Sequence, residues 1–333
     1  MAFKSVIRRM GASSALALLT FAVPLAHAHA EVVLAFADGA VTVIRGASLY
    51  RANEGTRLAG DDIIETDAGK SAQLEDSAGT LVALGPQTRV LLGAPTTTRG
   101  AAAMPSRISV LSGWLKVSRA AGTATAVSIA MPGLTVEPAN GTPWSIVAMA
   151  APQHVAMFAE AGDDTLTLSP PVAGQPPRAT LHAGQYAERA AGAPLRMQSR
   201  VSPEFIAGMP VGFRDALVAV SGHLANRHDL PTALRAVDYT DVSDWLASDI
   251  SARGTFIKRF RPRLKSAEFR AGVDAHLDVL PEWRPVLHPP PPKPATPPQT
   301  RPVTPPAPTH HAAPDAGIHY RDKPTPDDRE NAH

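Results

Sequence analysis

Short apolar runs separated by turn residues fill the chain from residue 32 to about residue 190. They recur at intervals of roughly 8 to 12 residues, which is typical of a β-sandwich or barrel. Within residues 41–45, Val41 and Val43 fall on one face of a strand, the pattern of an antiparallel sheet with a single buried face. The predicted strands are 32–36, 41–45, 62–66, 71–75, 80–84, 89–92, 107–111, 114–118, 126–131, 134–137, 144–148, 155–160, 165–168 and 179–183.

The apolar period changes between residues 203 and 287, where a helical spacing replaces the alternation. One stripe is spaced by four, three and four residues, and it consists of Phe213, Leu217, Val220 and Leu224. Asp241 or Ser243 can cap a second helix, and Ser266 can cap a third. We therefore expect a mainly β protein, with a sandwich or stacked hairpins over residues 31–195 and a small helical domain over residues 203–287.

Both ends of the chain have a distinct composition. Residues 288–333 are rich in proline and poor in apolar side chains, so we expect a disordered tail. At the start, Lys4, Arg8 and Arg9 precede an apolar run of about 16 residues and then Ala28-His29-Ala30. This is the pattern of a secretory signal peptide over residues 1–30, and the run is shorter than the roughly 20 residues that span a membrane.

Signal cleavage is expected after Ala30, which makes Glu31 the first mature residue, with cleavage after Ala28 as the alternative. The chain contains no cysteine, which excludes disulfides, a thiol nucleophile and the lipidated cysteine of a lipoprotein. We therefore expect a periplasmic protein with no transmembrane segment in the mature chain. The net charge is +2, and subtracting the three cations of the signal leaves −1 for residues 31–333, so charge does not indicate nucleic-acid binding.

Ala68-Gly69-Lys70-Ser71 raises the question of a phosphate-binding loop. That motif requires a glycine where this chain has Ile64, and it requires a helix after the lysine. Here an apolar run follows, then a Gly-Thr turn, then another apolar run. The segment is better explained as strand, turn and strand, with Lys70 in solvent.

The same region resembles the FecR domain. Five pieces follow one another in the order of that family: 39–46 (GAVTVIRG), 58–66 (LAGDDIIET), 69–74 (GKSAQL), 76–85 (DSAGTLVALG) and 88–90 (TRV). The likeness is close over residues 38–92, and it departs from the D-G-T piece at Ser77-Ala78-Gly79, which is one residue longer. Gly60-Asp61 allows a tight entry into a strand, and Asp61 can accept backbone N–H bonds there.

The resemblance implies a β scaffold. In membrane-spanning FecR regulators this domain relays a signal from an outer-membrane transporter to a cytoplasmic sigma factor. Here the β region follows a signal peptide directly, so the resemblance implies a secreted FecR-like module without sigma-factor control.

A cluster of cations with two phenylalanines, Phe256 and Phe260, is the sharpest candidate site. Its members, taken together with the aromatic residue beside the tail, are Lys258, Arg259, Arg261, Arg263, Lys265 and Trp283. These cations could bind an anionic lipid, a glycan carboxylate or an acidic protein surface. The alternative is a helix end whose phenylalanines are core residues and whose cations face water.

Other polar groups have simpler explanations. Asp61-Asp62 and Asp163-Asp164 lie at turns, and His310, His311 and His319 lie in the tail. Ser221-Gly-His223 lacks the strand and glycines of a nucleophile elbow. We therefore predict no catalytic residue, metal or cofactor. The predicted function is a non-enzymatic binding, scaffold or signalling module of the cell envelope, with a peptidoglycan- or glycan-binding module as the alternative.

Overall fold

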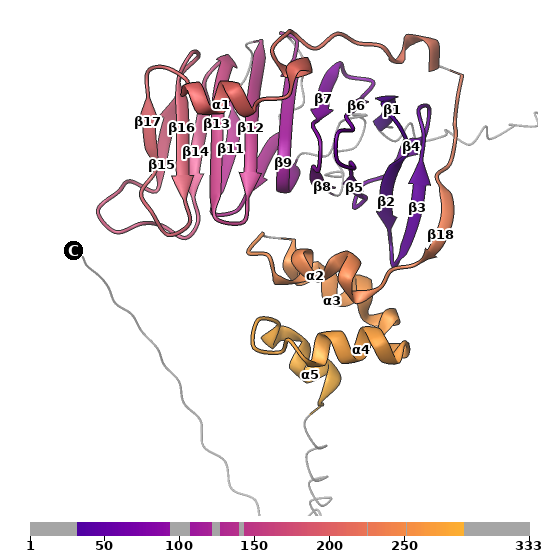
Figure 1. Cartoon of the computed structure of the whole chain (residues 1–333). Helices are drawn as coiled ribbons and strands as arrows, with labels where there is room; N and C mark the ends of the chain where they lie inside the picture. The colour runs from indigo at the N-terminus through magenta and orange to yellow at the C-terminus, as the bar shows by residue number, and fades with distance from the viewer. Residues whose placement is uncertain are drawn as a thin grey trace, which may run out of the picture. The chain divides into compact units, whose positions relative to one another are not determined.

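A computed structural model describes residues 32–93, 107–121, 127–139, 143–224, 226–250 and 252–289 (Figure 1). The predicted signal peptide with Ala28, Ala30 and Glu31, and the proline-rich tail from residue 290 onward, lie outside these residues. The chain divides into a compact unit, Met1–Pro289, and a second unit, Pro290–His333. Among the described helices, none combines the length and the apolar character needed to cross a membrane.

The described strands form two sheets that share the strand β9 (Figure 1). The first sheet has the spatial order β4 (Arg57–Leu58), β1 (Val32–Ala37), β6 (Ala72–Glu75), β7 (Thr80–Leu84), β9 (Arg107–Arg119), β12 (Trp144–Ala151), β13 (His154–Ala161), β16 (Tyr186–Ala190) and β17 (Arg196–Gln198). The second has the order β18 (Thr232–Ala236), β3 (Ser48–Ala52), β2 (Val41–Arg45), β5 (Ile63–Glu65), β8 (Arg89–Leu92), β9, β10 (Ser128–Met131), β11 (Leu134–Pro138), β14 (Asp164–Leu168) and β15 (Arg178–Leu181). These pairings are antiparallel except that of β9 with β10.

β9 crosses from one sheet to the other at Gly113. Residues up to Ser112 pair with β8, and Gly113 onward pairs with β12. Gly113 has a φ of +96°, and a Cβ there would lie 2.4 Å from Thr88 Cα. Only glycine accepts both the left-handed backbone and this close approach, so Gly113 fixes where the strand changes layer.

The main core lies between the two sheets, and apolar side chains from both fill it. Leu34, Val82 and Leu115 enter it from the first sheet, and Val43 and Ile129 enter it from the second. The alternation along each strand therefore gives a β-sandwich, which confirms the predicted fold class.

Helices cover the outer face of the second sheet. They are α2 (Tyr239–Ala247), α3 (Arg253–Phe260), α4 (Ala267–Asp274) and α5 (Arg284–Leu287). Their side chains form a second apolar cluster with Ile44, Ile63, Leu91 and Leu111 of the sheet. Since Ile63 and Leu91 face the helices while their neighbours Ile64 and Leu92 face the main core, these strands are apolar on both faces.

The outer face of the first sheet is crossed by residues 199–231, which we call the strap (Figure 1). The strap contains α1 (Pro203–Gly208) and two 3₁₀ turns, Val211–Phe213 and Ser221–Leu224. Its Phe205, Met209 and Phe213 form an apolar cluster with Ala83, Val147, Ala156 and Tyr186 of the sheet. It carries the chain from β17, at one edge of the first sheet, to β18, at an edge of the second.

Polar contacts fix the strap along its length. Lys116, which is 1% exposed, donates through Nζ to the carbonyls of Phe213 and Asp215, each at 2.8 Å. The Glu75 carboxylate accepts the backbone N–H groups of Val220, at 2.7 Å, and Ser221, at 3.1 Å. Because these contacts use strap carbonyl and N–H groups, the strap does not need a helix to satisfy them.

The strap also corrects one helix prediction. The stripe from Phe213 to Leu224 forms no α-helix, and only its two ends are 3₁₀ turns. Phe213 belongs to the apolar cluster on the outer face of the first sheet, and Leu224 belongs to a separate cluster with Val33 and Ala35. The apolar spacing therefore reflects two anchor points on a sheet rather than one helix face.

Other differences are local. The runs predicted at 107–111 and 114–118 are one strand, β9, and β3, β4, β16, β17 and β18 were not predicted. β18 lies within the region expected to be helical, and it pairs with β3. The helix α2 begins at Tyr239 after Asp238, earlier than predicted, whereas Ser266 caps α4 as predicted and accepts from Phe269 N at 3.4 Å.

The strand after Lys70 answers the question of the phosphate loop. Residues Ala72–Glu75 form β6, which pairs with β7 across a turn at Gly79. No helix follows the lysine, and Lys70 Nζ lies 3.4 Å from the carbonyl of Asp38. The segment is strand, turn and strand, as predicted.

Candidate functional site

The predicted cationic cluster lies on α3 and on the 3₁₀ helix η3 (Arg261–Lys265) that continues it. Phe256 and Phe260 are 1% and 0% exposed, and they pack with Trp245 in the helical cluster. The ring centroids of Trp245 and Phe256 are 6.3 Å apart in an edge-to-face arrangement. The two phenylalanines are therefore core residues, and they fix which side of α3 faces the sandwich.

Arg259 is not a free surface cation, because its guanidinium donates hydrogen bonds to backbone carbonyls of the sandwich. Its guanidinium donates from Nε to the carbonyl of Gly46 at 2.8 Å, from Nη1 to Asp61 at 2.6 Å and from Nη2 to Ile44 at 2.6 Å. Burial lowers the pKa of Arg259, and the nearby carboxylates of Asp61 and Asp62 oppose that effect. The side chain thus joins α3 to the β2–β3 turn and to the loop between β4 and β5.

That loop belongs to the FecR-like motif. The carboxylate that accepts hydrogen bonds within it is that of Asp62 rather than Asp61. Asp62 is 1% exposed and accepts from Arg45 Nε at 2.9 Å, Arg45 Nη2 at 2.6 Å and the Ala59 amide at 2.8 Å. The hydrogen bonds to Asp62 raise the pKa of Arg45 despite its burial. Asp61 instead takes a left-handed backbone, with φ of +68°, and offers its carbonyl to Arg259.

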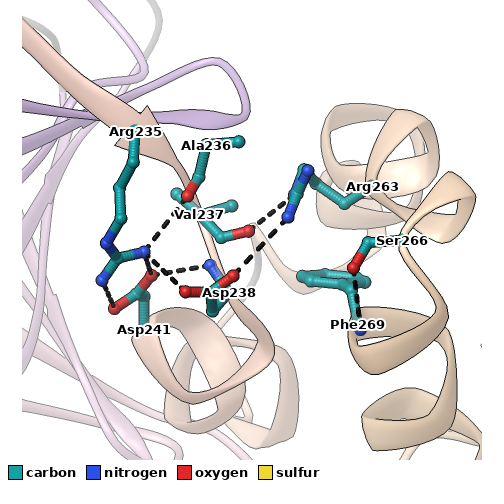
Figure 2. A network of polar contacts seen from close by, with 8 residues as sticks. All are labelled: Arg235, Ala236, Val237, Asp238, Asp241, Arg263, Ser266 and Phe269. Carbon is teal, nitrogen blue, oxygen red and sulfur yellow. Dashed lines mark hydrogen bonds and ion pairs between the residues drawn. The ribbon is translucent and has the colours of Figure 1, made fainter.

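Arg263 is also used inside the molecule (Figure 2). Its Nε donates to the carbonyl of Val237 at 2.6 Å, and its Nη2 lies 3.6 Å from Asp238 Oδ1. Figure 2 shows Asp238 between Arg263 and Arg235, and Asp241 next to Arg235. Arg235 Nη1 lies 2.9 Å from the Asp238 carboxylate and 2.6 Å from that of Asp241. Burial alone would raise the pKa of Asp241, but the hydrogen bonds from Arg235 and the Asp238 amide hold it below its ordinary value. This network links β18, α2 and η3.

The remaining cations of the cluster, Lys258, Arg261 and Lys265, are exposed, and we call them the free cations. Lys258 lies in the last turn of α3, and Arg261 and Lys265 lie at the two ends of η3. Within the described residues they form no ion pair. Arg259 and Arg263 hold the backbone that carries them, so the free cations project from a fixed element.

Trp283, the aromatic candidate for binding, lies in the core. It is 1% exposed and belongs to the helical cluster, so its ring offers no face to a ligand. The predicted group therefore separates into a buried aromatic, two structural arginines and three free cations. Sequence spacing alone could not separate them, because adjacent arginines differ only in what the fold places beside them.

The structure also contains a cavity that no sequence motif indicates. A cavity of about 470 Å³ lies among the turns of the sandwich and the end of α2, with Arg189 in its wall. Its lining comes from segments far apart in the chain, so no local motif marks it. Among the described residues, no group of three or more His, Asp or Glu side chains is placed to hold a metal ion.

The fold and site define a β-sandwich braced by helices, with a fixed group of free cations. No family model and no curated protein matches the chain. Among solved structures, the chain is similar to two crystal structures of a candidate anti-sigma factor from Parabacteroides distasonis. Each is 13% identical with a TM-score of 0.34, and the match covers 44% of this chain and 63% or 62% of theirs.

The matched region thus spans less than two thirds of those structures. A likeness at this TM-score carries no information about function. The resemblance of residues 38–92 to the FecR domain continues to rest on its sequence motifs.

Proposed function

We propose that this protein is a non-enzymatic FecR-like binding module of the periplasm, and that its free cations dock an acidic surface of an envelope protein. The observation that carries the proposal is that the five cations between residues 258 and 265 fall into two groups, one bound within the molecule and one exposed. Arg259 and Arg263 are bound to backbone carbonyls, whereas Lys258, Arg261 and Lys265 are exposed on the same short element.

A fixed group of like charges favours association for two reasons. It raises the local concentration of an anionic partner and so accelerates encounter. It also loses little conformational freedom on binding, because the backbone that carries it is already held. Such binding is screened by salt, since the Debye length is about 8 Å at physiological ionic strength.

The glycan alternative loses its aromatic platform in this structure. Sugar recognition would have used Trp283, whose ring is buried in the helical cluster. An acidic protein requires only the cations. We therefore favour a protein partner, and binding to purified peptidoglycan that survives high salt would contradict that choice.

The test is proximity labelling in the producing cell, followed by pull-down of the labelled partner at low and high salt. The triple variant Lys258→Glu, Arg261→Glu and Lys265→Glu should lose the partner. A matched variant reverses the same amount of charge at the exposed residues Arg178, Arg196 and Arg200, and it should retain the partner.

Arg259 is left intact in both variants, because its loss would disturb the fold. Equal capture by the two variants would refute the docking site, and capture of phosphatidylglycerol vesicles instead of protein would refute the partner class. Cell fractionation and the mass of the mature chain test the periplasmic location and cleavage before Glu31.

A further inference from the structure

The cavity near α2 has a mostly apolar lining. Its volume of about 470 Å³ falls within the roughly 300–1,000 Å³ of small-ligand sites. The turns between β10 and β11, between β12 and β13, and after β14 and β16 form one side, and the end of α2 forms another. Apolar contacts come from Leu111, Pro132, Pro152, Val155, Pro170 and Ala247.

One wall carries a buried cation, Arg189, which is 4% exposed. Its Nε donates to the carbonyl of Ala193 at 3.1 Å, its Nη1 to that of Gly133, and its Nη2 lies 3.5 Å from that of Pro170. Gly133 has a φ of +72°, and a Cβ there would lie 2.8 Å from Arg189 Nη1. A glycine is therefore required for the guanidinium to reach this position.

All the acceptors of Arg189 are neutral. Within the described residues the guanidinium forms no ion pair, although a buried charge is costly unless it is paired. Carbonyl dipoles offset part of that cost, but three contacts leave donors of the five N–H groups unused, and the one to Pro170 is long. A carboxylate matches the planar donor pair of a guanidinium and would complete its coordination.

Two carboxylates and one cation, Arg89, line the α2 side of the cavity. Asp244 and Asp249 both line it. Asp244 is already paired with Arg89 Nη1 at 2.7 Å, whereas Asp249 forms no ion pair within the described residues. His154 also lines the cavity, and its Nε2 lies 3.7 Å from Glu188 Oε2. Asp249 is thus the group available to an amine.

We propose that this cavity binds a short peptide with free ends. Arg189 receives the terminal carboxylate, the prolines and Leu111 contact the apolar side chains, and Asp249 receives the amine. This site is separate from the free cations, and it gives the protein a small-ligand specificity in addition to its docking surface.

Isothermal titration calorimetry with the tripeptides Ala-Ala-Ala, Ala-Leu-Ala and Ala-Pro-Ala tests the proposal on the whole chain. At least one should bind saturably, its C-terminal amide should bind about tenfold or more weakly, and its N-acetyl form should also be weakened. Equal affinity for acid and amide, or no saturable binding by any of the three, would overturn the assignment.

Variants locate the site. Arg189→Lys keeps the charge but loses the planar donor pair, so it should weaken binding. Since Arg189 also joins three turns, a second variant avoids it: Ala247→Phe fills the cavity from α2, and Ala271→Phe on α4 is its matched control. Binding that survives Ala247→Phe, or that is lost in both alanine variants, would place the peptide elsewhere. The free-cation variant should keep peptide binding, so failure of this proposal and failure of the docking proposal are separable.

Discussion

Asp164 gives the sharpest prediction for stability. It begins β14, is 1% exposed, and accepts from Trp144 Nε1 at 2.7 Å through Oδ1. Its Oδ2 has no hydrogen-bond partner within the described residues. Burial raises the pKa of Asp164 from 3.8 to about 7, against the hydrogen bond from Trp144 and with a further increase from the charge of Asp163. Arg119 is the cation near this site, 6.0 Å from the Trp144 ring.

The sign of the pH effect follows from the raised pKa. Between pH 3.8 and about 7 the folded chain holds a proton on Asp164 that the unfolded chain has lost. The free energy of unfolding therefore falls as pH rises through this window, by about 1.4 kcal/mol per pH unit. Asp164→Asn cannot ionise, and its carbonyl oxygen can still accept from Trp144.

The stability of the Asn variant relative to the native chain should therefore increase by about 3 kcal/mol between pH 5 and pH 8. Any fixed cost of the amide cancels in this comparison. Urea unfolding followed by tryptophan fluorescence at several pH values measures it. Asp67→Asn is the control, because Asp67 is exposed and lies outside the turn that carries Asp163 and Asp164. Parallel curves for the native chain and Asp164→Asn would show that the buried carboxyl does not control this window.

Three further variants test the contacts that hold the layers together. Lys116→Met should lower the free energy of unfolding by about 3–5 kcal/mol in urea titrations, because it removes the ion pair with Glu160, 2.8 Å from Lys116 Nζ, and leaves the buried carbonyl of Phe213 without its donor. Lys70→Met at the exposed turn should change it by less than about 0.5 kcal/mol. Arg259→Met removes three hydrogen bonds and should cost about 2–3 kcal/mol, with amide exchange accelerating in α3 before the sandwich; uniform acceleration would contradict this. Burial would raise the pKa of Glu75, but hydrogen bonds from the strap lower it, so its contribution is present above pH 4.5 and is lost as pH falls. Glu75→Gln should therefore increase proteolysis of the strap at neutral pH and reduce its acid sensitivity, and an unchanged cleavage pattern would exclude Glu75 as its anchor.

Strand positions were largely predictable because alternation is a local signal. The bounds of β2, β7 and β8 match those expected from the sequence. The adjacent apolar pairs Ile63-Ile64 and Leu91-Leu92 also indicate from the sequence that these strands of the second sheet are buried on both faces. β18 could not be predicted in this way, since all five of its residues are exposed and only its pairing with β3 makes it a strand.

The candidate site was less predictable, because it depends on contacts between distant segments. Arg259 and Lys258 are neighbours in the chain. Arg259 donates to three carbonyls about 200 residues earlier, whereas Lys258 is exposed. Trp283 lies next to the proline-rich tail in sequence and inside the helical cluster in space. Arg189 stands out only once the turns at Gly133, Pro170 and Ala193 are seen to converge on it.

The pairing of β18 with β3 joins residues about 180 positions apart, and it has a consequence for the order of assembly. Closing so large a loop is slow, because its entropy must be lost before the new strand contributes any stability. Until residue 236 has arrived, the N-terminal hairpin has an unpaired edge, the kind of surface on which chains aggregate. The edge of β3 is therefore covered only when β18 pairs with it, and a nascent chain released before β18 is synthesised should need a chaperone.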